Sequence, residues 1–472
     1  MIFATNWAFD LSDFSNVWLF ATQAGLLLIA LLFGNLLRRV IPFLRKSYIP
    51  SALIGGLLLL LINLLFESLG VTIDGIEGSG IIEPRIMQII TYHALAIGFI
   101  AMTLKIANKD NKATFKSSVQ NGALTGGTYM LQAVLGILVS LIFFWAGSSM
   151  FYDAGVLLPL GFGQGPGNAM TWDLTFTDSG LFDGNGTVGL TIASIGFIVA
   201  SIGSIIYIAI FKHKGQIKPR ESLMMERKIE DFEIEGEIED SESIDKLSIQ
   251  IALVFVAYAL AFGIMVAFAK LSNFTNSIAW GFNFIWGVIT ANLVKLVYKF
   301  FRKKGVIKKK YINNYQMDRI SGFAFDMMII AGVAAIDMDI VFQYIWFIII
   351  ICVLGTVATF IYVRLMSKLC FKGFEHEAFL TNYGTLTGTA SNGMIFLREV
   401  DPNYETPMSN IFIVSQLPAM IFVAPLLLLL SLSAKSTTGC YIALGIFATL
   451  FFVYTGLNIF LAKHKKKVKE EK

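Results

Sequence analysis

A glycine- and proline-rich stretch, residues 158–173, interrupts a chain made mostly of long apolar runs. Glycine and proline are the poorest helix formers, so we expect a helix to break here. Lipid cannot satisfy the backbone groups that a break frees, and a break at membrane depth is tolerated only inside protein or beside a watery cavity. A second such stretch, residues 382–393, occupies a corresponding place in the second half. Paired breaks in two halves favour a transporter binding site.

The composition of the remaining chain indicates a helical membrane protein. Hydrophobic residues make up 56% of the 472 residues and charged residues only 15%, against the roughly 25% of soluble domains. Cys352, Cys370 and Cys440 have neither paired nor metal-like spacing, and we interpret them as small core residues. The N-terminus is acidic and lacks a basic region, which predicts no cleavable signal peptide. The net charge of +4 says little about partners because basic residues are segregated by loop, and we expect no nucleic-acid partner.

Lysine and arginine follow alternate apolar runs, and this bias sets the expected orientation. Four basic residues follow the first run, which places the N-terminus outside and this loop in the cytoplasm. The same rule gives a cytoplasmic C-terminus, and every expected loop orientation agrees with the Lys/Arg bias. We expect a multi-pass protein of the cell membrane. The predicted spans are about 17–37, 50–66, 86–104, 123–146, 188–211, 247–269, 278–297, 320–336, 344–365, 410–432 and 441–461.

Five spans with a broken loop between the fourth and fifth recur in opposite orientation. We therefore predict an all-α polytopic membrane protein with two inverted-topology repeats of five transmembrane helices. Each repeat carries a re-entrant Gly-rich hairpin loop, at about 153–180 and about 376–400, and one C-terminal helix follows. The predicted parts are a first repeat (1–211), a polar cytoplasmic linker, acidic in its second half (212–246), a second repeat (247–433), and a terminal helix with a basic cytoplasmic tail (434–472).

The first motif has groups suited to a carboxylate. Its glycines allow tight turns and close approach of a ligand, and residues 169–172 could start a half-helix whose free N–H groups favour an anion. The alternative is a packed turn that binds nothing, although so many polar groups in apolar surroundings need partners. The glycines are Gly161, Gly163, Gly165 and Gly167. The candidate substrate-binding residues of this motif are Gly163, Gln164, Gly165, Gly167, Asn168 and Thr171.

The second motif has a dense set of side-chain oxygens. With unwound backbone carbonyls these suit a small hard cation such as Na⁺. The alternative is that the hydroxyls bond back to their own helix. The candidate substrate contacts are Thr385, Thr387 and Asn392. The Na⁺ candidates are Thr387, Thr389, Ser391, Asn392 and, in a separate span, Asp326.

Ionisable residues within spans are functional candidates by default. Asp326 could bind a cation, a proton or a substrate amino group, or could form an ion pair or a cap in the bundle. His93 lies at a similar depth in a matching span, and its alternative is a hydrogen-bonded packing residue. Arg398 could reach a substrate carboxylate, or could lie solvated beside Glu399. Asp337 and Asp339, at the end of a span, are expected at the interface.

The motifs Gly161–Ala169 and Gly384–Asn392, together with the order of the spans, resemble the bacterial sodium/glutamate symporter family. The resemblance covers most of the chain. It implies a fold similar to that of the 2-hydroxycarboxylate carriers, a dimer with scaffold and mobile transport domains, and both hairpins in the transport domain. It also implies elevator-type, Na⁺-coupled uptake of an anionic amino acid. Gln164 ends a Gly-Phe-Gly-Gln stretch where the family has a Gly-His-Gly-Thr-like one, and the terminal helix and acidic linker are further departures.

We expect a secondary active transporter that carries glutamate or a related carboxylate by Na⁺-coupled symport, as a homodimer. It is expected to be no enzyme and to need no cofactor, with Na⁺ as coupling ion, since no catalytic motif stands out. One alternative is a carrier of a different organic anion, by exchange, export or H⁺ coupling on the same fold. Another is a channel or membrane sensor. The short linker argues against a sensor, and the paired breaks argue against a simple pore.

Overall fold

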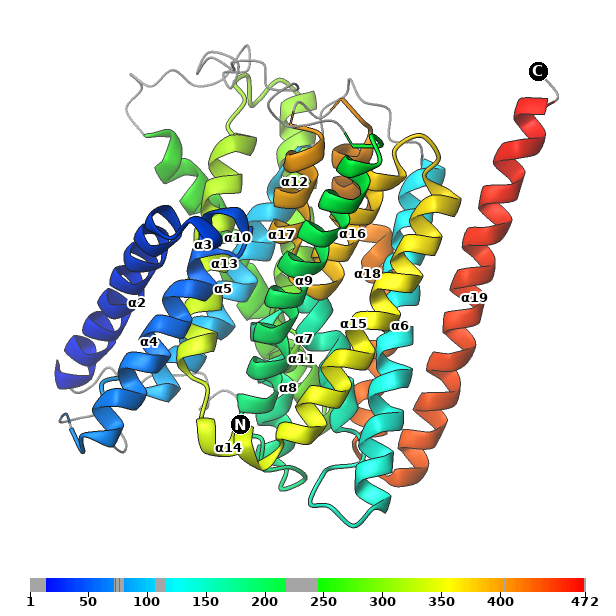
Figure 1. Ribbon diagram of the computed structural model, residues 1–472. Helices are drawn as coiled ribbons and strands as arrows, with labels where there is room; N and C mark the ends of the chain where they lie inside the picture. The colour runs from blue at the N-terminus through cyan, green and yellow to red at the C-terminus, as the bar shows by residue number, and fades with distance from the viewer. Residues whose placement is uncertain are drawn as a thin grey trace. The chain divides into compact units, whose positions relative to one another are not determined.

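The computed structural model describes residues 14–71, 73, 76, 80–106, 115–217, 245–402 and 405–470. Within these ranges the regular structure is helical, with no strand (Figure 1). Ten of the described helices are long and apolar enough to cross a membrane, so the protein is an all-α polytopic membrane protein that spans the bilayer several times. Residues 218–244 of the predicted linker lie outside the described part of the chain.

The long helices coincide with predicted spans. The ten candidates for membrane-spanning helices are α2 (Phe14–Val40), α4 (Ser51–Ser68), α5 (Pro84–Leu104), α6 (Phe115–Trp145), α9 (Thr187–His213), α10 (Lys246–Ala269), α12 (Asn283–Lys303), α15 (Ile345–Cys370), α18 (Met408–Ser433) and α19 (Thr437–Glu470). The predicted span 320–336 forms α13 (Asn314–Ala334), which is not among the ten and carries Asp318, Arg319 and Asp326.

Shorter helices connect the long ones. They are α3 (Pro42–Lys46), the 3₁₀ turn η1 (Ala154–Val156), α7 (Leu157–Gln164), α8 (Pro166–Asp178), α11 (Asn273–Gly281), α14 (Met338–Gln343), α16 (Glu375–Thr387) and α17 (Ala390–Val400). Several helices begin at side chains that accept from orphan backbone N–H groups. Asp245 caps α10, Asn313 caps α13, and Asp337 caps α14 by accepting from the N–H of Asp339 at 2.9 Å.

The described helices form two compact units, and each unit takes segments from both halves of the sequence. The first unit contains α2 as far as Asn35, α4 from Gly55, α5, and α10 to α13. The second unit contains α3, α6 to α9, and α14 to α19. The two units therefore cut across the predicted repeats, because each half gives its early helices to the first unit and its later helices to the second.

In the first unit, α5 packs against α10, α12 and α13. Small residues let these helices approach closely: a side chain at Gly98 would press on the ring of Phe325, and one at Gly287 would press on Ile100. An apolar cluster fills much of the space between these helices. It consists of Ile100, Ala101, Leu104, Val254, Ala257, Ala291 and Met317.

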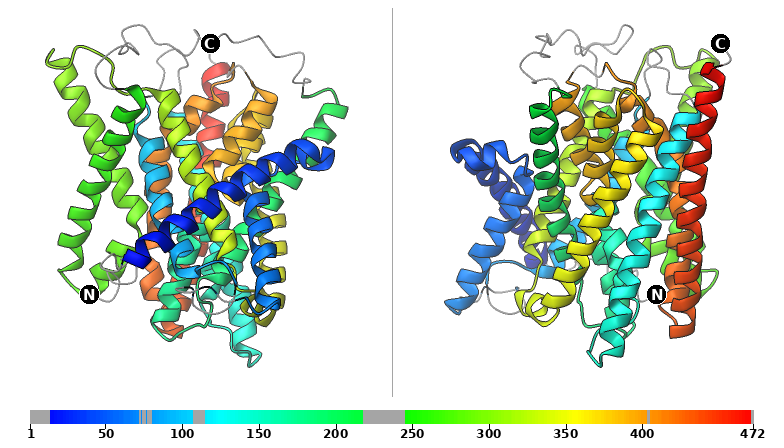
Figure 2. Two further views of the ribbon diagram at one scale, coloured as in Figure 1. Left: turned by 90° about the vertical axis from the view of Figure 1, so that its left-hand side faces the viewer. Right: turned by 45° about the vertical axis from the view of Figure 1, so that its right-hand side comes forward.

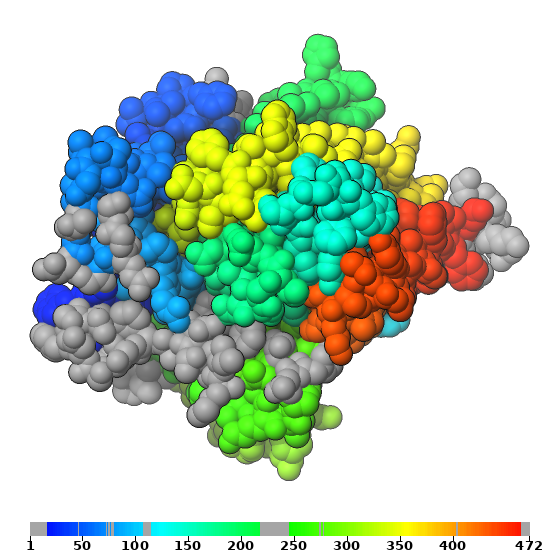
Figure 3. Space-filling model, turned by 90° about the horizontal axis from the view of Figure 1, so that it is seen from below, coloured from blue at the N-terminus to red at the C-terminus, as the bar shows by residue number. Residues whose placement is uncertain are grey.

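In the second unit, α6 is the central helix, because it packs against α15, α18 and α19. Figure 2 shows α19 running alongside α6, and Figure 3 shows α15 (yellow), α6 (cyan) and α19 (orange to red) side by side at one end. Gly122 and Gly126 let α18 approach, since a side chain at either would collide with Pro418 or Phe422. The predicted terminal helix is therefore an integral part of this unit.

A buried carboxyl group directly before η1 contacts the end of α18 and the first turn of α19. Asp153 is fully buried, and its Oδ2 accepts a hydrogen bond of 2.6 Å from the Ser433 hydroxyl. The Cys440 thiol donates to Oδ1 over 3.7 Å. Burial raises the pKa of Asp153 to about 7, although the hydrogen bonds from Ser433 and Cys440 act in the opposite direction. The other two cysteines are also free and buried, as the sequence predicts.

Candidate functional site

A single glycine breaks the first motif. Gly165 separates α7 from α8, and its φ of 86° lies in the left-handed region that favours glycine. Pro166 opens α8, where its missing N–H and fixed φ suit the first helical position. The predicted interruption of the helix is therefore present. Whether these helices form a re-entrant hairpin in the membrane stays a prediction.

The other glycines of this motif do not make turns, so that expectation is wrong. Gly161 and Gly163 lie within α7, and Gly167 lies within α8. Two of them serve close packing instead. A Cβ at Gly161 would lie 3.1 Å from the backbone nitrogen of Ala193 in α9, and one at Gly163 would collide with the Tyr129 ring. Glycine thus brings α7 against α6 and α9 rather than bending it.

The second motif also forms two helices with a short break. Gly388 and Thr389 separate α16 from α17. The two helices touch at their own glycines, since a Cβ at Gly384 would lie 3.0 Å from the Cα of Gly393. Both motifs are therefore helix–break–helix pairs, and both belong to the second unit.

Helix α9 passes between the two breaks. A side chain at Gly196 would lie 3.1 Å from the ring of Phe162 in α7 and would collide with the carbonyl oxygen of Thr387 at the end of α16. Phe162 is three residues from the break at Gly165 and Thr387 directly precedes the break at Gly388, so the two breaks come together around Gly196.

Helix α6 reaches both breaks from another side. The Gln132 side chain donates from Nε2 to the carbonyl oxygen of Leu386 at 3.0 Å and to the Thr359 hydroxyl of α15 at 2.9 Å. One turn earlier, the Tyr129 ring packs against Gly163 of α7, next to Gln164. Residues three apart share a helix face, so one face of α6 contacts both motifs.

Buried polar atoms without a hydrogen-bond partner among the described residues gather at these breaks. Such atoms are rare in native proteins, and each costs about 1–3 kcal/mol when nothing satisfies it. All the side chains concerned are at most 7% exposed. The atoms are Gln132 Oε1, Gln164 Oε1, both amide atoms of Asn168, Thr389 Oγ1 and Asn392 Nδ2. A polar ligand between the breaks would supply the missing partners.

Three threonine hydroxyls of the two motifs donate to their own helices, as the alternative interpretation of the second motif holds for two of them, whereas the Thr389 hydroxyl does not. Thr171 donates to the Gly167 carbonyl at 2.7 Å. Thr385 and Thr387 donate to carbonyls one turn earlier, at 2.7 and 2.6 Å. Their protons are therefore occupied, and these hydroxyls offer a ligand only oxygen lone pairs. Such oxygens suit a cation better than a carboxylate.

Two helix N-termini begin at the breaks, those of α8 and α17. Neither has a side-chain cap: Gly165 precedes α8, and Thr389 precedes α17 without capping it. The first N–H groups of a helix have no acceptor within the helix, and the helix dipole adds partial positive charge. Both breaks therefore present donors to an anion.

The remaining candidate residues lie away from the two breaks or already form hydrogen bonds within the protein. Ser391 is partly buried in the first turn of α17, and Arg398 is exposed near the end of that helix. Asp326 belongs to α13 of the first unit, whereas the other candidates belong to the second. His93, also in the first unit, makes a 2.6 Å hydrogen bond between Nδ1 and the Tyr258 hydroxyl. Its alternative interpretation, a hydrogen-bonded packing residue, is therefore the better one.

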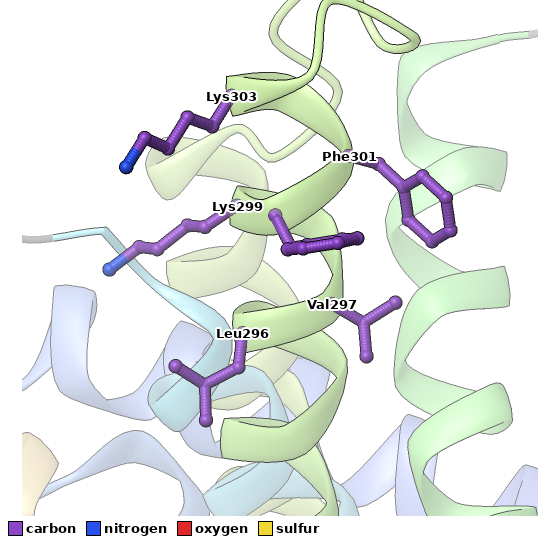
Figure 4. Close-up of a pocket in the computed structure, with 6 residues that line it drawn as sticks. Leu296, Val297, Lys299, Phe301 and Lys303 are labelled. Carbon is purple, nitrogen blue, oxygen red and sulfur yellow. The ribbon is translucent and has the colours of Figure 1, made fainter.

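A surface hollow on α12 does not belong to this site. It is lined by Leu296, Val297, Lys299, Phe300, Phe301 and Lys303 (Figure 4). All of these side chains come from one helix of the first unit, and none belongs to either motif. Among the described residues, no group of three or more His, Cys, Asp and Glu side chains could hold a metal ion.

Sequence reasoning missed three residues of the site: Tyr129, Gln132 and Thr359. Gln132 had a usable signal, because a buried glutamine within an apolar span needs partners. Tyr129 and Thr359 had none, since aromatic and hydroxyl residues are common in such helices. No family model and no curated protein matches this chain.

Proposed function

We propose that this protein is a secondary active transporter that takes up glutamate, or a related carboxylate, together with Na⁺. The observation that carries the proposal is the meeting of two helix breaks around Gly196, with unpartnered amides on both sides. Broken helices that meet inside a bundle are a common construction of secondary-transporter sites. The resemblance to sodium/glutamate symporters agrees with this interpretation.

The uncapped N-termini of α8 and α17 support an anionic substrate. In this proposal the first N–H groups of each helix donate to a substrate carboxylate. The carbonyl oxygens of Gln132 and Gln164, which lack donors in the described part of the chain, accept from an amino group of the substrate. The fully buried amide of Asn168 can do both, because its Nδ2 donates and its Oδ1 accepts.

The helix C-termini support a coupling cation. α7 and α16 end at the breaks, and the last carbonyls of each helix have no N–H donor within the helix. With the lone pairs of Thr385 and Thr387, these carbonyls form a neutral oxygen set that suits Na⁺. A bound cation beside the carboxylate strengthens anion binding, and the carboxylate strengthens cation binding by the same factor.

The composition of the two units supports an elevator mechanism with inverted repeats. Both breaks belong to the second unit, so a substrate held between them would travel with that unit alone. Each half contributes comparable elements to it: a long helix, a broken pair and a further long helix. In the proposal the second unit is the transport domain and the first is the scaffold, through which two copies form the homodimer that the resemblance implies.

A carrier of a different organic anion is the second candidate. It is favoured by Gln164, which stands where the family has a smaller threonine-like residue and whose Oε1 has no donor among the described residues. A glutamine carbonyl selects a substrate with a hydrogen-bond donor at that position. The same site would then carry a different acid with the same ion.

The test is uptake into proteoliposomes that contain the purified full-length protein. Radiolabelled glutamate should accumulate when an inward Na⁺ gradient is present and should not accumulate when K⁺ replaces Na⁺. Equal uptake with either ion would reject Na⁺ coupling. Uptake of another acid, but not of glutamate, would keep the site and the coupling and replace the substrate.

A further inference from the structure

A second group of unpartnered polar atoms lies in the second unit, near the ends of α9 and α15 and the start of α16. Its centre is Arg364 of α15, whose guanidinium lies over two aromatic rings of α9. The guanidinium carbon is 5.3 Å from the ring centre of Tyr207 and 4.9 Å from that of Phe211. Arg364 packs near the start of α16, whereas the second break follows the other end of that 13-residue helix, so this group is separate from the proposed transport site.

Two donor groups here have no hydrogen-bond acceptor among the described residues. Arg364 Nη1 is buried and has no hydrogen-bond partner among the described residues. Ser367, one turn further along the same face of α15, is fully buried, and its hydroxyl is likewise without a partner in the described chain. An arginine that merely extended to solvent would not leave Nη1 buried beside an unbonded hydroxyl.

His376 adds a third donor. Its Nδ1 is 2.8 Å from the Tyr207 hydroxyl. In the tautomer in which Tyr207 donates this bond, the proton of the neutral ring is on Nε2. Burial lowers the pKa of His376, and the positive charge of Arg364 lowers it further, against the opposing effect of Glu375. Burial and the charge of Arg364 both favour the neutral ring.

Arg364 forms no ion pair with a carboxylate in the described part of the chain. No described carboxylate lies within 4.0 Å of its guanidinium, and the Glu375 carboxylate instead accepts a 3.1 Å hydrogen bond from the Gly373 N–H. Further positive charge surrounds the group. Lys212 and Lys214 end α9, where Lys214 Nζ lies 5.3 Å from the Phe211 ring centre, and Lys368 lies on α15.

We propose that Arg364, Ser367 and His376 bind a phosphate group, either of a lipid headgroup or of free phosphate. A planar guanidinium held against aromatic rings presents its N–H groups in a fixed direction, which suits the oxygens of a phosphate. The hydroxyl and the imidazole N–H donate to the remaining oxygens. The group lies at the basic ends of long apolar helices, which is the depth at which anionic lipid headgroups meet a membrane protein.

The test measures thermal unfolding of the purified full-length protein in detergent. Phosphatidylglycerol, phosphatidylcholine and inorganic phosphate are titrated separately, with chloride at matched ionic strength as the salt control. A ligand that binds the folded protein raises its Tm by mass action. Stabilisation by phosphatidylglycerol at concentrations where inorganic phosphate has no effect identifies a lipid site, and the reverse identifies a free phosphate site.

Arg364→Gln should raise the half-saturating concentration of the active ligand about tenfold, as loss of a charged hydrogen bond predicts. Ser367→Ala, which removes no charge, should weaken binding by a smaller factor and gives a second reading if Arg364→Gln does not fold. Lys435→Gln is the matched control, because this lysine is exposed between α18 and α19 of the same unit and belongs to neither group of residues. Equal weakening by Lys435→Gln and Arg364→Gln, or an unchanged response of Arg364→Gln, would overturn the proposal. The readout is independent of transport, so it stands or falls separately from the proposed function.

Discussion

Gln132 of α6 donates to the carbonyl oxygen of Leu386 at 3.0 Å, in the last turn of α16 before the second break. That carbonyl lies where a helix end leaves acceptors unsatisfied, so the glutamine fixes the end of α16 from a neighbouring helix. The same amide holds Thr359. One side chain thus ties α6, α15 and α16 together at the candidate site.

Gln132→Ala should therefore weaken substrate binding and the fold together. We expect the half-saturating substrate concentration to rise about tenfold and the free energy of unfolding to fall by about 1–3 kcal/mol, because two buried acceptors lose their donor. Gln120→Ala is the matched control. It lies on the same helix and is equally buried, but its amide has no partner among the described residues. If Gln120→Ala lost as much uptake as Gln132→Ala, Gln132 would have no specific role in substrate binding.

Asn168→Leu should separate binding from stability. Both amide atoms of Asn168 are buried without a partner in the described chain, which costs the folded protein their desolvation energy. Leucine has a similar size and no polar atoms, so the replacement removes that cost. We expect a Tm equal to or above that of the wild type, with uptake reduced by about a hundredfold. Asn382→Leu provides the contrast, because Asn382 bonds to Asn121 at 2.9 Å and should lose stability. If Asn168→Leu lowered the Tm as much as Asn382→Leu, the amide would have a structural role.

Gly196→Ala should force the two breaks apart. The added methyl would collide with the Thr387 carbonyl and press on Phe162, so we expect uptake to be lost, along with part of the stability. Gly445→Ala, in α19 of the same unit, has open space around it and should be neutral or stabilising by about 1 kcal/mol. Measured uptake of Gly196→Ala close to that of the wild type would show that the breaks tolerate separation.

Asp153 predicts a pH dependence of stability. Its pKa rises from 3.8 to about 7 on folding because of burial, so the folded protein retains a proton that the unfolded chain has lost. Stability should therefore fall as pH rises between about 4 and 7, by about 4 kcal/mol at most for this group. Asp153→Asn should lack this contribution, and the difference in Tm between the two proteins should narrow as pH falls. A difference that is constant across this range would contradict the assignment.

The two interruptions could be predicted from sequence because glycine and proline act locally on a helix. The role of each glycine could not. Gly165 has the positive φ that breaks the helix, whereas Gly161 and Gly163 are helical and admit neighbours from α9 and α6. That distinction depends on which helices pack together, and packing between distant segments leaves no local pattern.

The division into two units could not be predicted from the sequence either. Apolar runs predict that helices exist, but not which of their faces meet, so Tyr129 and Gln132 could not be assigned to both breaks beforehand. Asp326 illustrates the converse. Its place in a span made it a Na⁺ candidate beside Thr387, although the two residues belong to different units.

In the proposed function, both breaks form one site for a carboxylate and Na⁺. The most direct measurement is calorimetric binding of glutamate to the purified protein, in Na⁺ and in K⁺, with the wild type, Asn168→Leu and Thr387→Val. We predict binding in Na⁺ alone, abolished by Asn168→Leu from the first motif and weakened at least about tenfold by Thr387→Val from the second. Wild-type affinity in both variants, with either ion, would contradict the account.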